Sequence, residues 1–307
     1  NSCLNNNVIY NFTYCYFYIV KIFSSMRRGA IINLSAWLIL PFMDAIAKYL
    51  SYSLPVLQVT WFRFFFSTLI TLLFIFFFSR NSLVSSKNLK SQIIRGLLLL
   101  TSSVLFFYSI SIISLAKALT IAFICPLMVT ALSPYFLKER VGPRRWTAVI
   151  IGFIGVLIVI RPGIVEFNWA SFAALGTGFC YALYLIVTRK LKNTDNGLLT
   201  LLITSIVGTL VLSLYLPFIW VKPNFSEYLF AINMGLIAAL AHGMIIISYN
   251  YSDASKLAPL GYFEILTNIL IGYIWFSDIP DKYTFIGLLI IILSGVYVFR
   301  REQFNNN

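Results

Sequence analysis

The feature that most limits the fold of this chain is a series of apolar segments of about the length that crosses a bilayer, which takes about 20 residues. Charged residues make up 11% of the sequence and the mean hydropathy is +0.87, whereas charge is about a quarter of an ordinary soluble domain. No break between the segments is long enough for a soluble domain. The sequence therefore predicts an all-α polytopic membrane protein with ten transmembrane helices, at about 29–50, 55–79, 93–114, 117–137, 146–161, 169–190, 197–221, 228–251, 257–276 and 283–300.

Part of the first half of the chain is similar to part of the second half. A shift of 139 positions places Lys117 on Lys256 and Arg161 on Arg300 without a gap. The central loop is basic in the first copy (KERVGPRR, 138–145) and net acidic in the second (SDIPDK, 277–282). Basic loops stay in the cytoplasm, so this change of sign indicates two copies inserted in opposite directions, as in many secondary transporters. We predict two inverted five-helix repeats, 26–163 and 164–301, followed by a cytoplasmic tail, 302–307.

The distribution of Lys and Arg predicts the orientation. If Arg27 and Arg28 are cytoplasmic and the sides alternate, most basic residues fall on the cytoplasmic side. The opposite side then holds Lys117, Arg161, Lys222 and Lys282. We expect both termini to be cytoplasmic, in a bacterial-type cytoplasmic (inner) membrane. The net charge of +13 is explained by topology and by contact with anionic membrane lipids, and we expect no nucleic-acid partner.

Residues 1–25 do not fit this scheme. They are a mixture of Asn, Tyr, Phe and Ile, and Met26 followed by Arg27 and Arg28 has the pattern of an inward-anchored first helix. We expect Met26 to be the initiator and residues 1–25 to lie outside the native fold. A signal peptide is the rival reading, although no basic region precedes the apolar stretch. An eleventh span is a third reading, and it would move the C-terminus across the membrane.

Charged residues inside the apolar segments are candidate site residues, because a buried charge in a membrane needs a partner or a wet cavity. Asp44 and Lys48 lie one turn apart on the same helix face. They either contact substrate as the polar floor of the site or as a gate, or form an internal ion pair. Lys48 is near enough to the helix end for its ammonium to reach the membrane interface. Arg63 binds substrate or serves as a counter-ion, with Asp44 as its expected partner. Glu264 takes up a coupling proton or holds a cationic substrate. Together these charges sum to zero, which favours a zwitterionic or mixed-charge metabolite.

Uncharged residues extend this candidate site. His242 contacts substrate or forms a hydrogen bond between helices. Asn268 follows Glu264 by about one turn and satisfies that carboxylate or takes part in a gate. Tyr108 and Tyr262 are candidates to line the pathway, with packing in the core as the alternative.

Other patterns narrow the class of protein. Pro126 and Pro259 either break the fourth and ninth segments, exposing carbonyls to a cavity, or only kink them. The 4 cysteines show no paired spacing and the chain has 1 histidine, so we expect neither a metal site nor a disulfide framework. No nucleophile-and-base motif indicates an enzyme, no phosphate-binding loop indicates ATP use, and no filter or pore ring indicates a channel. We expect no cofactor.

From Met26 onward the chain resembles the EamA branch of the drug/metabolite transporter superfamily. The resemblance rests on Asp44…Lys48, FRF around Arg63, RGLLL (95–99), LAKALTIAFICPLMVTALSPYFLKERVGPRRW (115–146), GFIGVLIVIRPG (152–163) and Pro259…Glu264…Asp278. It implies an inverted five-plus-five bundle with cytoplasmic termini, a central cavity and transport of small organic metabolites, often outward. DAIAKYL, FRFFFS and IIRGLLL look most like members that exchange S-adenosylmethionine in intracellular bacteria, and amino-acid exporters share them. The sulfonium, amine and carboxylate of that compound would meet Asp44, Glu264 and Arg63.

We therefore predict a secondary transporter that works by alternating access around a mid-membrane site. As an exporter or exchanger, it would carry amino acids or related compounds such as S-adenosylmethionine. The alternative is a flippase of the same architecture for a lipid or lipid-linked precursor, which lipid should stimulate and soluble amino acids should not affect. The sequence leaves the direction, the coupling ion and the oligomeric state open.

Overall fold

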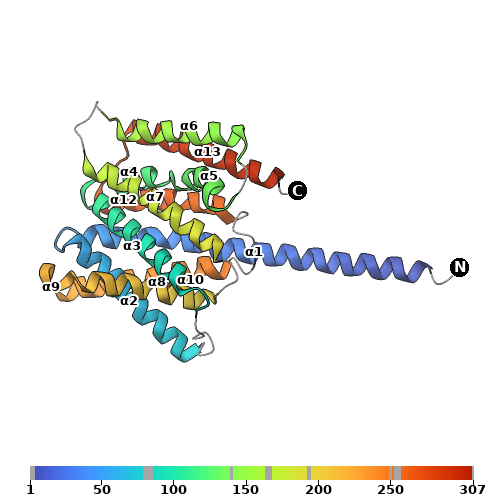
Figure 1. Cartoon of the computed structure of the whole chain (residues 1–307), viewed down its shortest axis with the longest axis horizontal. Coiled ribbons are helices and arrows are strands. Elements are labelled where there is room, and N and C mark those ends of the chain that lie inside the picture. Colours follow the sequence, from blue (N-terminus) through green and yellow to red (C-terminus); the bar gives the residue numbers. More distant parts are fainter. Residues whose placement is uncertain are drawn as a thin grey trace.

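The computed structural model describes residues 4–78, 86–138, 141–162, 168–191, 195–248, 251 and 257–305, with side chains over slightly narrower ranges. The regular elements of these residues are helices, packed side by side in one bundle (Figure 1). Their bounds are α1 (Leu4–Leu50), α2 (Val56–Phe78), α3 (Leu89–Ile112), α4 (Leu115–Ala122), α5 (Cys125–Phe136), α6 (Pro143–Ile160), α7 (Trp169–Lys190), α8 (Gly197–Ser213), α9 (Leu216–Ile219), α10 (Phe225–Ser248), the 3₁₀ helix η2 (Ala258–Tyr262), α12 (Phe263–Phe276) and α13 (Lys282–Asn305).

The lengths and apolarity of these helices confirm a polytopic α-helical membrane protein. Seven segments are long and apolar enough to cross a bilayer: Arg27–Leu50, Val56–Phe77, Leu89–Ile112, Leu115–Phe136, Pro143–Ile160, Trp169–Lys190 and Phe225–Ser248. Three shorter apolar helices are Gly197–Ser213, Leu260–Phe276 and Lys282–Tyr297. Each of these segments overlaps one apolar block predicted from the sequence, with bounds that differ by up to four residues for the seven longer ones. The predicted block at 197–221 holds both α8 and the short α9.

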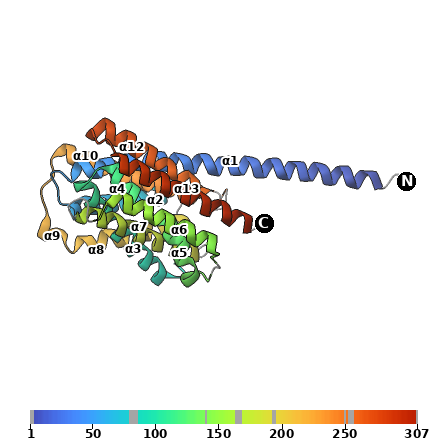
Figure 2. The same cartoon turned by 90° about the horizontal axis from the view of Figure 1, so that it is seen from above.

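The two ends of the chain lie on the same end of the bundle, and α1 projects far beyond it (Figures 1 and 2). We call the opposite end, where α6 ends and α13 begins, the distal end. The backbone of α1 is helical from Leu4, but side chains before Arg27 lie outside the described residues. The start at Met26 therefore stays a prediction. The division into two repeats near residue 163 also stays a prediction, because residues 163–167 lie outside the described residues.

The fourth apolar segment is broken, as Pro126 predicted. α4 ends at Ala122 and α5 begins at Cys125. Proline lacks an N–H and its ring collides with the carbonyl four residues earlier, which here is that of Ala122. That carbonyl lies against Gly178 of α7, where an added Cβ would be 2.6 Å from the oxygen. Pro259 likewise lies in η2, which precedes α12 rather than continuing it.

Positions related by the 139-residue shift have similar local structures. Lys138, two residues after the end of α5, and Ser277, directly after α12, are both in the left-handed region, with φ of 57° and 54°. Phe123 and Tyr262 lie at the two helix breaks, and their ring centroids are 5.5 Å apart.

The helices also pair in a symmetrical way. α1 packs on α10 as α7 packs on α3, while α6 packs on α13 and α2 on α8. At the α6–α13 contact, a Cβ on Gly287 would lie 2.6 Å from the carbonyl oxygen of Gly155, so the two backbones approach closely.

Candidate functional site

Arg63 is the centre of the candidate site. It lies in α2 with 6% of its surface exposed, and its guanidinium donates to the Ser103 hydroxyl of α3. Its Nη2 lies 3.0 Å from Nε2 of His242 in α10. The Phe64 and Phe107 rings lie 5.0 and 5.8 Å from its Cζ. Three helices therefore hold a cation through neutral groups and aromatic faces.

The contact with Arg63 fixes the form of His242. An arginine can only donate hydrogen bonds, so Nε2 of the histidine must accept. The imidazole is therefore neutral in this arrangement, with its proton on Nδ1. Protonation of both ring nitrogens would put two donors and two positive charges against each other. The predicted interhelical hydrogen bond of His242 is confirmed, and its partner is the candidate substrate residue.

Two buried carboxylates belong to the same region of the bundle. Asp44 in α1 is 3% exposed and Glu264 in α12 is 9% exposed. Asp44 is close enough to interact electrostatically with both Arg63 and Glu264. Asp44 was expected to be the partner of Arg63, and the two side chains interact electrostatically. The hydrogen-bond contacts of the guanidinium are made with Ser103 and His242.

The two carboxylates repel each other if both are charged, so their site suits a proton or the cationic part of a ligand. Asn268 of α12 is fully buried and lies beside Asp44. Its amide nitrogen and oxygen have no partner in good hydrogen-bonding geometry. The amide of Asn268 interacts with the Asp44 carboxylate, and its remaining donor and acceptor capacity is available to a ligand.

Lys48 pairs elsewhere than predicted. Its Nζ lies 2.5 Å from Oδ2 of Asp278 and 3.4 Å from the carbonyl of Ile113, and it stands over the Phe276 ring at 5.0 Å. The alternative of an ion pair with Asp44 is therefore wrong, because Lys48 is a full turn closer to the end of α1. The Lys48–Asp278 pair links α1 to the segment between α12 and α13.

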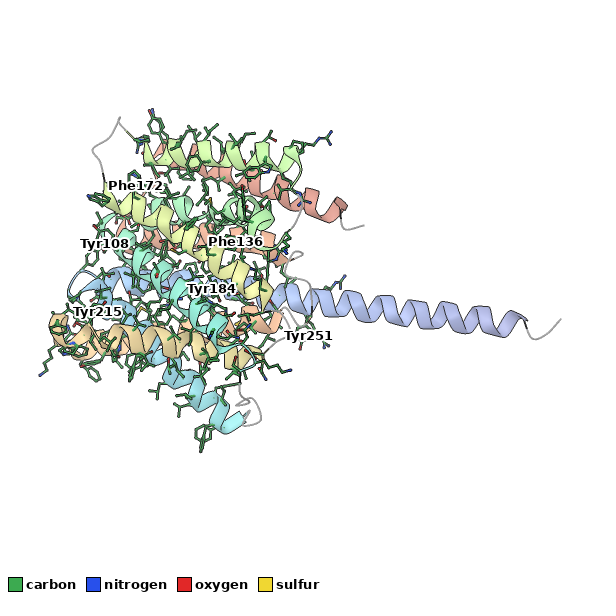
Figure 3. All side chains as sticks on the ribbon, viewed as in Figure 1. Tyr108, Phe136, Phe172, Tyr184, Tyr215 and Tyr251 are labelled. Atoms are coloured by element: carbon green, nitrogen blue, oxygen red, sulfur yellow. The ribbon has the colours of Figure 1, made fainter. Side chains whose placement is uncertain are left out.

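Tyr108 and Tyr262 do not join the Arg63 cluster. Tyr108 of α3 is 38% exposed and lies toward the distal end (Figure 3). The hydroxyl of Tyr262 points at α13, where a Cβ on Gly295 would lie 1.6 Å from it. Tyr262 thus packs between the helix breaks and α13. The structure gives neither residue a contact with Arg63.

A second buried arginine, Arg95, was not predicted as a site residue, although it lies at the start of the predicted segment 93–114. It lies inside α3, is 2% exposed, and donates to Thr188 and Tyr184 of α7 at 2.8 and 2.9 Å. Its Nη1 also donates to Gln92 at 3.2 Å. An arginine seven positions into α3 with a glutamine one turn before it was the available signal, since both are costly in hydrocarbon.

Gln92 connects this arginine to Asp195, which lies between α7 and α8. The Asp195 carboxylate accepts hydrogen bonds from the Ser86 hydroxyl at 2.5 Å, the Lys87 amide at 2.9 Å and Gln92 at 2.8 Å. Desolvation alone would raise the pKa of Asp195, but these hydrogen bonds and the Lys87 charge hold it below its ordinary value. This network fixes the end of the bundle that carries the termini.

The metal and cysteine predictions concern residues that are only partly described. Within the described side chains, no group of three His, Cys, Asp or Glu residues could hold a metal ion. Cys125 and Cys180 are free thiols.

Buried charges gathered from several membrane-spanning helices define an integral membrane protein with a polar interior, the architecture of a small-molecule transporter rather than an enzyme. The EamA-like transporter family model matches twice, at residues 27–161 and 168–300. The chain therefore belongs to the EamA-like transporter family, within the drug/metabolite transporter superfamily.

Several characterised proteins are similar over most of their length. The S-adenosylmethionine uptake transporter of Rickettsia bellii is 28% identical, covering 85% of this chain and 89% of the relative. The riboflavin transporter of Vibrio cholerae is 26% identical, covering 90% of this chain and 94% of the relative. The pseudopaline exporter of Pseudomonas aeruginosa is 22% identical, covering 91% of this chain and 98% of the relative. A solved crystal structure shares the fold, with a TM-score of 0.63 at 18% identity over 89% of this chain and 98% of that one.

Proposed function

We propose that this chain is a secondary transporter of a zwitterionic metabolite, an amino acid or a related compound such as S-adenosylmethionine, across the cytoplasmic (inner) membrane. It exports or exchanges this substrate by alternating access. Ten helices form two inverted halves, 26–163 and 164–301, and both termini are cytoplasmic. Residues 1–25 and the tail 302–307 lie outside the two halves.

The observation that carries the proposal is the charge arrangement around Arg63. This buried guanidinium has donors that its contacts with Ser103 and His242 do not use. A carboxylate ligand can accept them in the forked geometry that arginine favours. The carboxylates of Asp44 and Glu264 then face the ammonium or sulfonium group of the same molecule.

The relatives support the class of cargo. The Rickettsia protein is named for uptake of S-adenosylmethionine, which carries a carboxylate, an amine and a sulfonium. The riboflavin transporter and the pseudopaline exporter widen the range to other small organic molecules. Because the relatives include both uptake and export proteins, we propose exchange as the activity to measure first.

The inverted arrangement is supported by the equivalent helix ends at Lys138 and Ser277 and by the paired breaks at Phe123 and Tyr262. Broken helices of this kind place backbone polar groups near a mid-membrane site. The change of loop charge between the repeats supports opposite insertion. The shorter helices α8, α12 and α13 would complete ten crossings with some local thinning of the bilayer.

Glu264 is the proposed site of proton coupling. It shares a buried region with Asp44, and two nearby carboxylates repel each other when both are charged, which favours the binding of one proton by the pair. Binding of a ligand cation would displace that proton. Lys48 and Asn268 are proposed gate or support residues at the edge of the same region.

The test is counterflow in proteoliposomes that contain the purified protein. Vesicles are loaded with unlabelled amino acids, S-adenosylmethionine or riboflavin, and uptake of each labelled compound is followed with and without a pH gradient. We expect exchange of a zwitterion, lost in Arg63→Gln and kept in Lys222→Gln, a matched change of an exposed cation. If none of the soluble compounds is exchanged and fluorescent lipid moves across the bilayer, the result would support the flippase instead.

A further inference from the structure

A surface pocket lies at the distal end, away from the Arg63 cluster. It has a volume of about 330 Å³ and lies beside the end of α6. The residues that line it are Ile154, Leu157, Ile158, Arg161, Pro162 and Tyr283. Ile154 and Leu157 are 48% and 40% exposed, on a helix that lies with α13 at the edge of the bundle (Figure 1). Exposed apolar side chains of a membrane span face lipid, so this is a lipid-facing groove.

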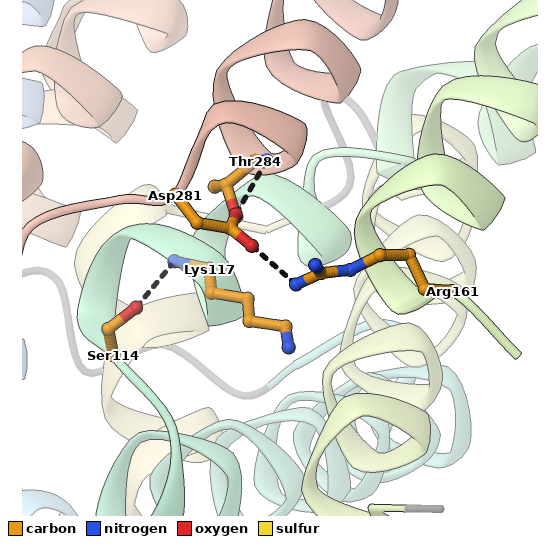
Figure 4. A network of polar contacts seen from close by, with 5 residues as sticks. All are labelled: Ser114, Lys117, Arg161, Asp281 and Thr284. Carbon is orange, nitrogen blue, oxygen red and sulfur yellow. Dashed lines mark hydrogen bonds and ion pairs between the residues drawn. The ribbon is translucent and has the colours of Figure 1, made fainter. Parts of the chain in front are cut away.

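The groove ends in a group of charged residues that Figure 4 shows from close by. Arg161 pairs with Asp281 and stands over the Tyr283 ring at 4.6 Å, while Lys282 lies 5.2 Å from the same ring. The Lys117 side chain extends toward the Arg161 guanidinium and interacts electrostatically with it and with Asp281. Three cations therefore lie close together, and among the described residues only Arg161 forms an ion pair with the Asp281 carboxylate, so the group has a net positive charge.

Two donors of this group are unused. Nε of Arg161 is buried without a hydrogen-bond partner. The ammonium of Lys117 has neither a hydrogen bond nor an ion pair within the described part of the chain. The Asp281 carboxylate is instead well satisfied, since it accepts from the Thr284 hydroxyl and amide at 2.6 and 2.9 Å as well as from Arg161. The unused hydrogen-bond donors of Arg161 and Lys117 can therefore bind an anion.

The location of these three cations at the distal end of the bundle is unusual for a membrane protein. In the proposed orientation, Lys117, Arg161 and Lys282 are three of the four basic residues on the non-cytoplasmic side. The general bias keeps basic residues in cytoplasmic loops, and here the exceptions gather at one point. They lie where the spans end, at the depth of lipid phosphates, directly beside an apolar groove.

We propose that this groove binds one anionic phospholipid. The phosphate accepts hydrogen bonds from Lys117 and from Nε of Arg161, and an acyl chain lies along Ile154 and Leu157. The headgroup would touch α4 and α6 of the first half and the start of α13 in the second. Bound lipid therefore stabilises the arrangement in which these three helices are together at the distal end.

Native mass spectrometry of the purified full chain tests this proposal. The detergent is supplemented in turn with phosphatidylglycerol, phosphatidylcholine or inorganic phosphate. The wild type is expected to retain one phosphatidylglycerol and to bind it at least tenfold more tightly than phosphatidylcholine. The double variant Lys117→Gln/Arg161→Gln should lose at least tenfold in phosphatidylglycerol affinity. Lys222→Gln should keep it, because that residue is the remaining basic residue on the same side.

Two further variants distinguish the contribution of the lipid headgroup from that of the apolar groove. Leu157→Trp fills the groove without changing charge and should weaken phosphatidylglycerol binding. Asp281→Asn removes the nearby negative charge and should strengthen it, an effect that a merely disturbed fold would not produce. The proposal is overturned if the double variant binds phosphatidylglycerol like the wild type, or if both lipids bind equally. Full displacement of the lipid by an equal concentration of inorganic phosphate would overturn the role of the groove.

Discussion

Replacement of Arg63 by glutamine should abolish binding of a carboxylate substrate while the protein still inserts into the membrane. Arg63 is 6% exposed, and its contacts with Ser103 and His242 are to neutral groups. Glutamine can keep one of these hydrogen bonds, so we expect a loss in stability of only about 1–2 kcal/mol.

The expected loss in substrate binding is larger. A forked pair between guanidinium and carboxylate provides two hydrogen bonds to a charged group, each worth about 1.5–3 kcal/mol. The loss of both costs about 3–6 kcal/mol, and each 1.4 kcal/mol is about tenfold in affinity. Arg63→Gln should therefore weaken binding about 100- to 20,000-fold. Arg63→Lys keeps the charge but loses the fork, and we expect an intermediate effect.

The alternative role of Arg63 is to neutralise Asp44, and a double variant separates the two roles. If Arg63 is only a counter-ion, Arg63→Gln/Asp44→Asn restores neutrality and recovers counterflow. If Arg63 binds the substrate carboxylate, the double variant stays inactive. Counterflow in proteoliposomes, normalised to the amount of inserted protein, is the assay. Counterflow by Arg63→Gln within twofold of the wild type would refute the substrate role altogether.

Other predictions concern the rest of the bundle. Glu264→Gln should retain exchange of a bound zwitterion at reduced rate but lose the effect of a pH gradient; a full pH response in this variant would remove Glu264 from proton coupling. Asp195→Asn should lower stability by about 1 kcal/mol at neutral pH, because the amide nitrogen that replaces Oδ2 cannot accept the hydrogen bonds that Ser86 and Gln92 donate to this partly exposed carboxylate. The pKa of Asp195 is held below its ordinary value, so this contribution is present above the unfolded-state pKa and disappears as pH falls through the folded-state value. Thermal unfolding in detergent should thus show the wild type approaching the variant in acid, and an equal difference at all pH values would contradict the assignment. Gly178→Ala should destabilise by about 1–3 kcal/mol, since its Cβ would lie 2.6 Å from the Ala122 carbonyl oxygen. Gly142→Ala is the matched control, because a Cβ there meets nothing within 4 Å; equal melting shifts for the two variants would show that the close approach at the helix break is not needed.

The apolar segments and their breaks were predictable because they depend on local sequence. A bilayer requires every spanning backbone to be hydrogen-bonded within the helix, so hydropathy defines the spans closely. Proline acts on the carbonyl four residues before it, so a disturbance of the helix near Ala122 could be predicted from Pro126, whereas the choice between a break and a kink could not. Buried charges could be predicted as candidate site residues for the same local reason, namely their cost in hydrocarbon.

The partners of those charges were not predictable, because they depend on how distant helices pack. Lys48 is near Asp44 in sequence, yet it pairs with Asp278 from a loop far along the chain. Arg63 contacts His242 across the bundle, and no local pattern joins α2 to α10. Arg95 lies at the start of a predicted span, but its burial depends on Gln92 and on Tyr184 from another helix, which provide its neutral partners.

The most direct test of the central claim compares a zwitterion with its methyl ester in the wild-type protein. The unlabelled competitor in counterflow is either the exchanged substrate or the same molecule without a free carboxylate. If Arg63 binds that carboxylate, the ester should compete about 100-fold less well or worse, as expected for loss of a charged forked pair. Equal competition by the ester and the acid would show that the carboxylate is not recognised, and would contradict the proposed site.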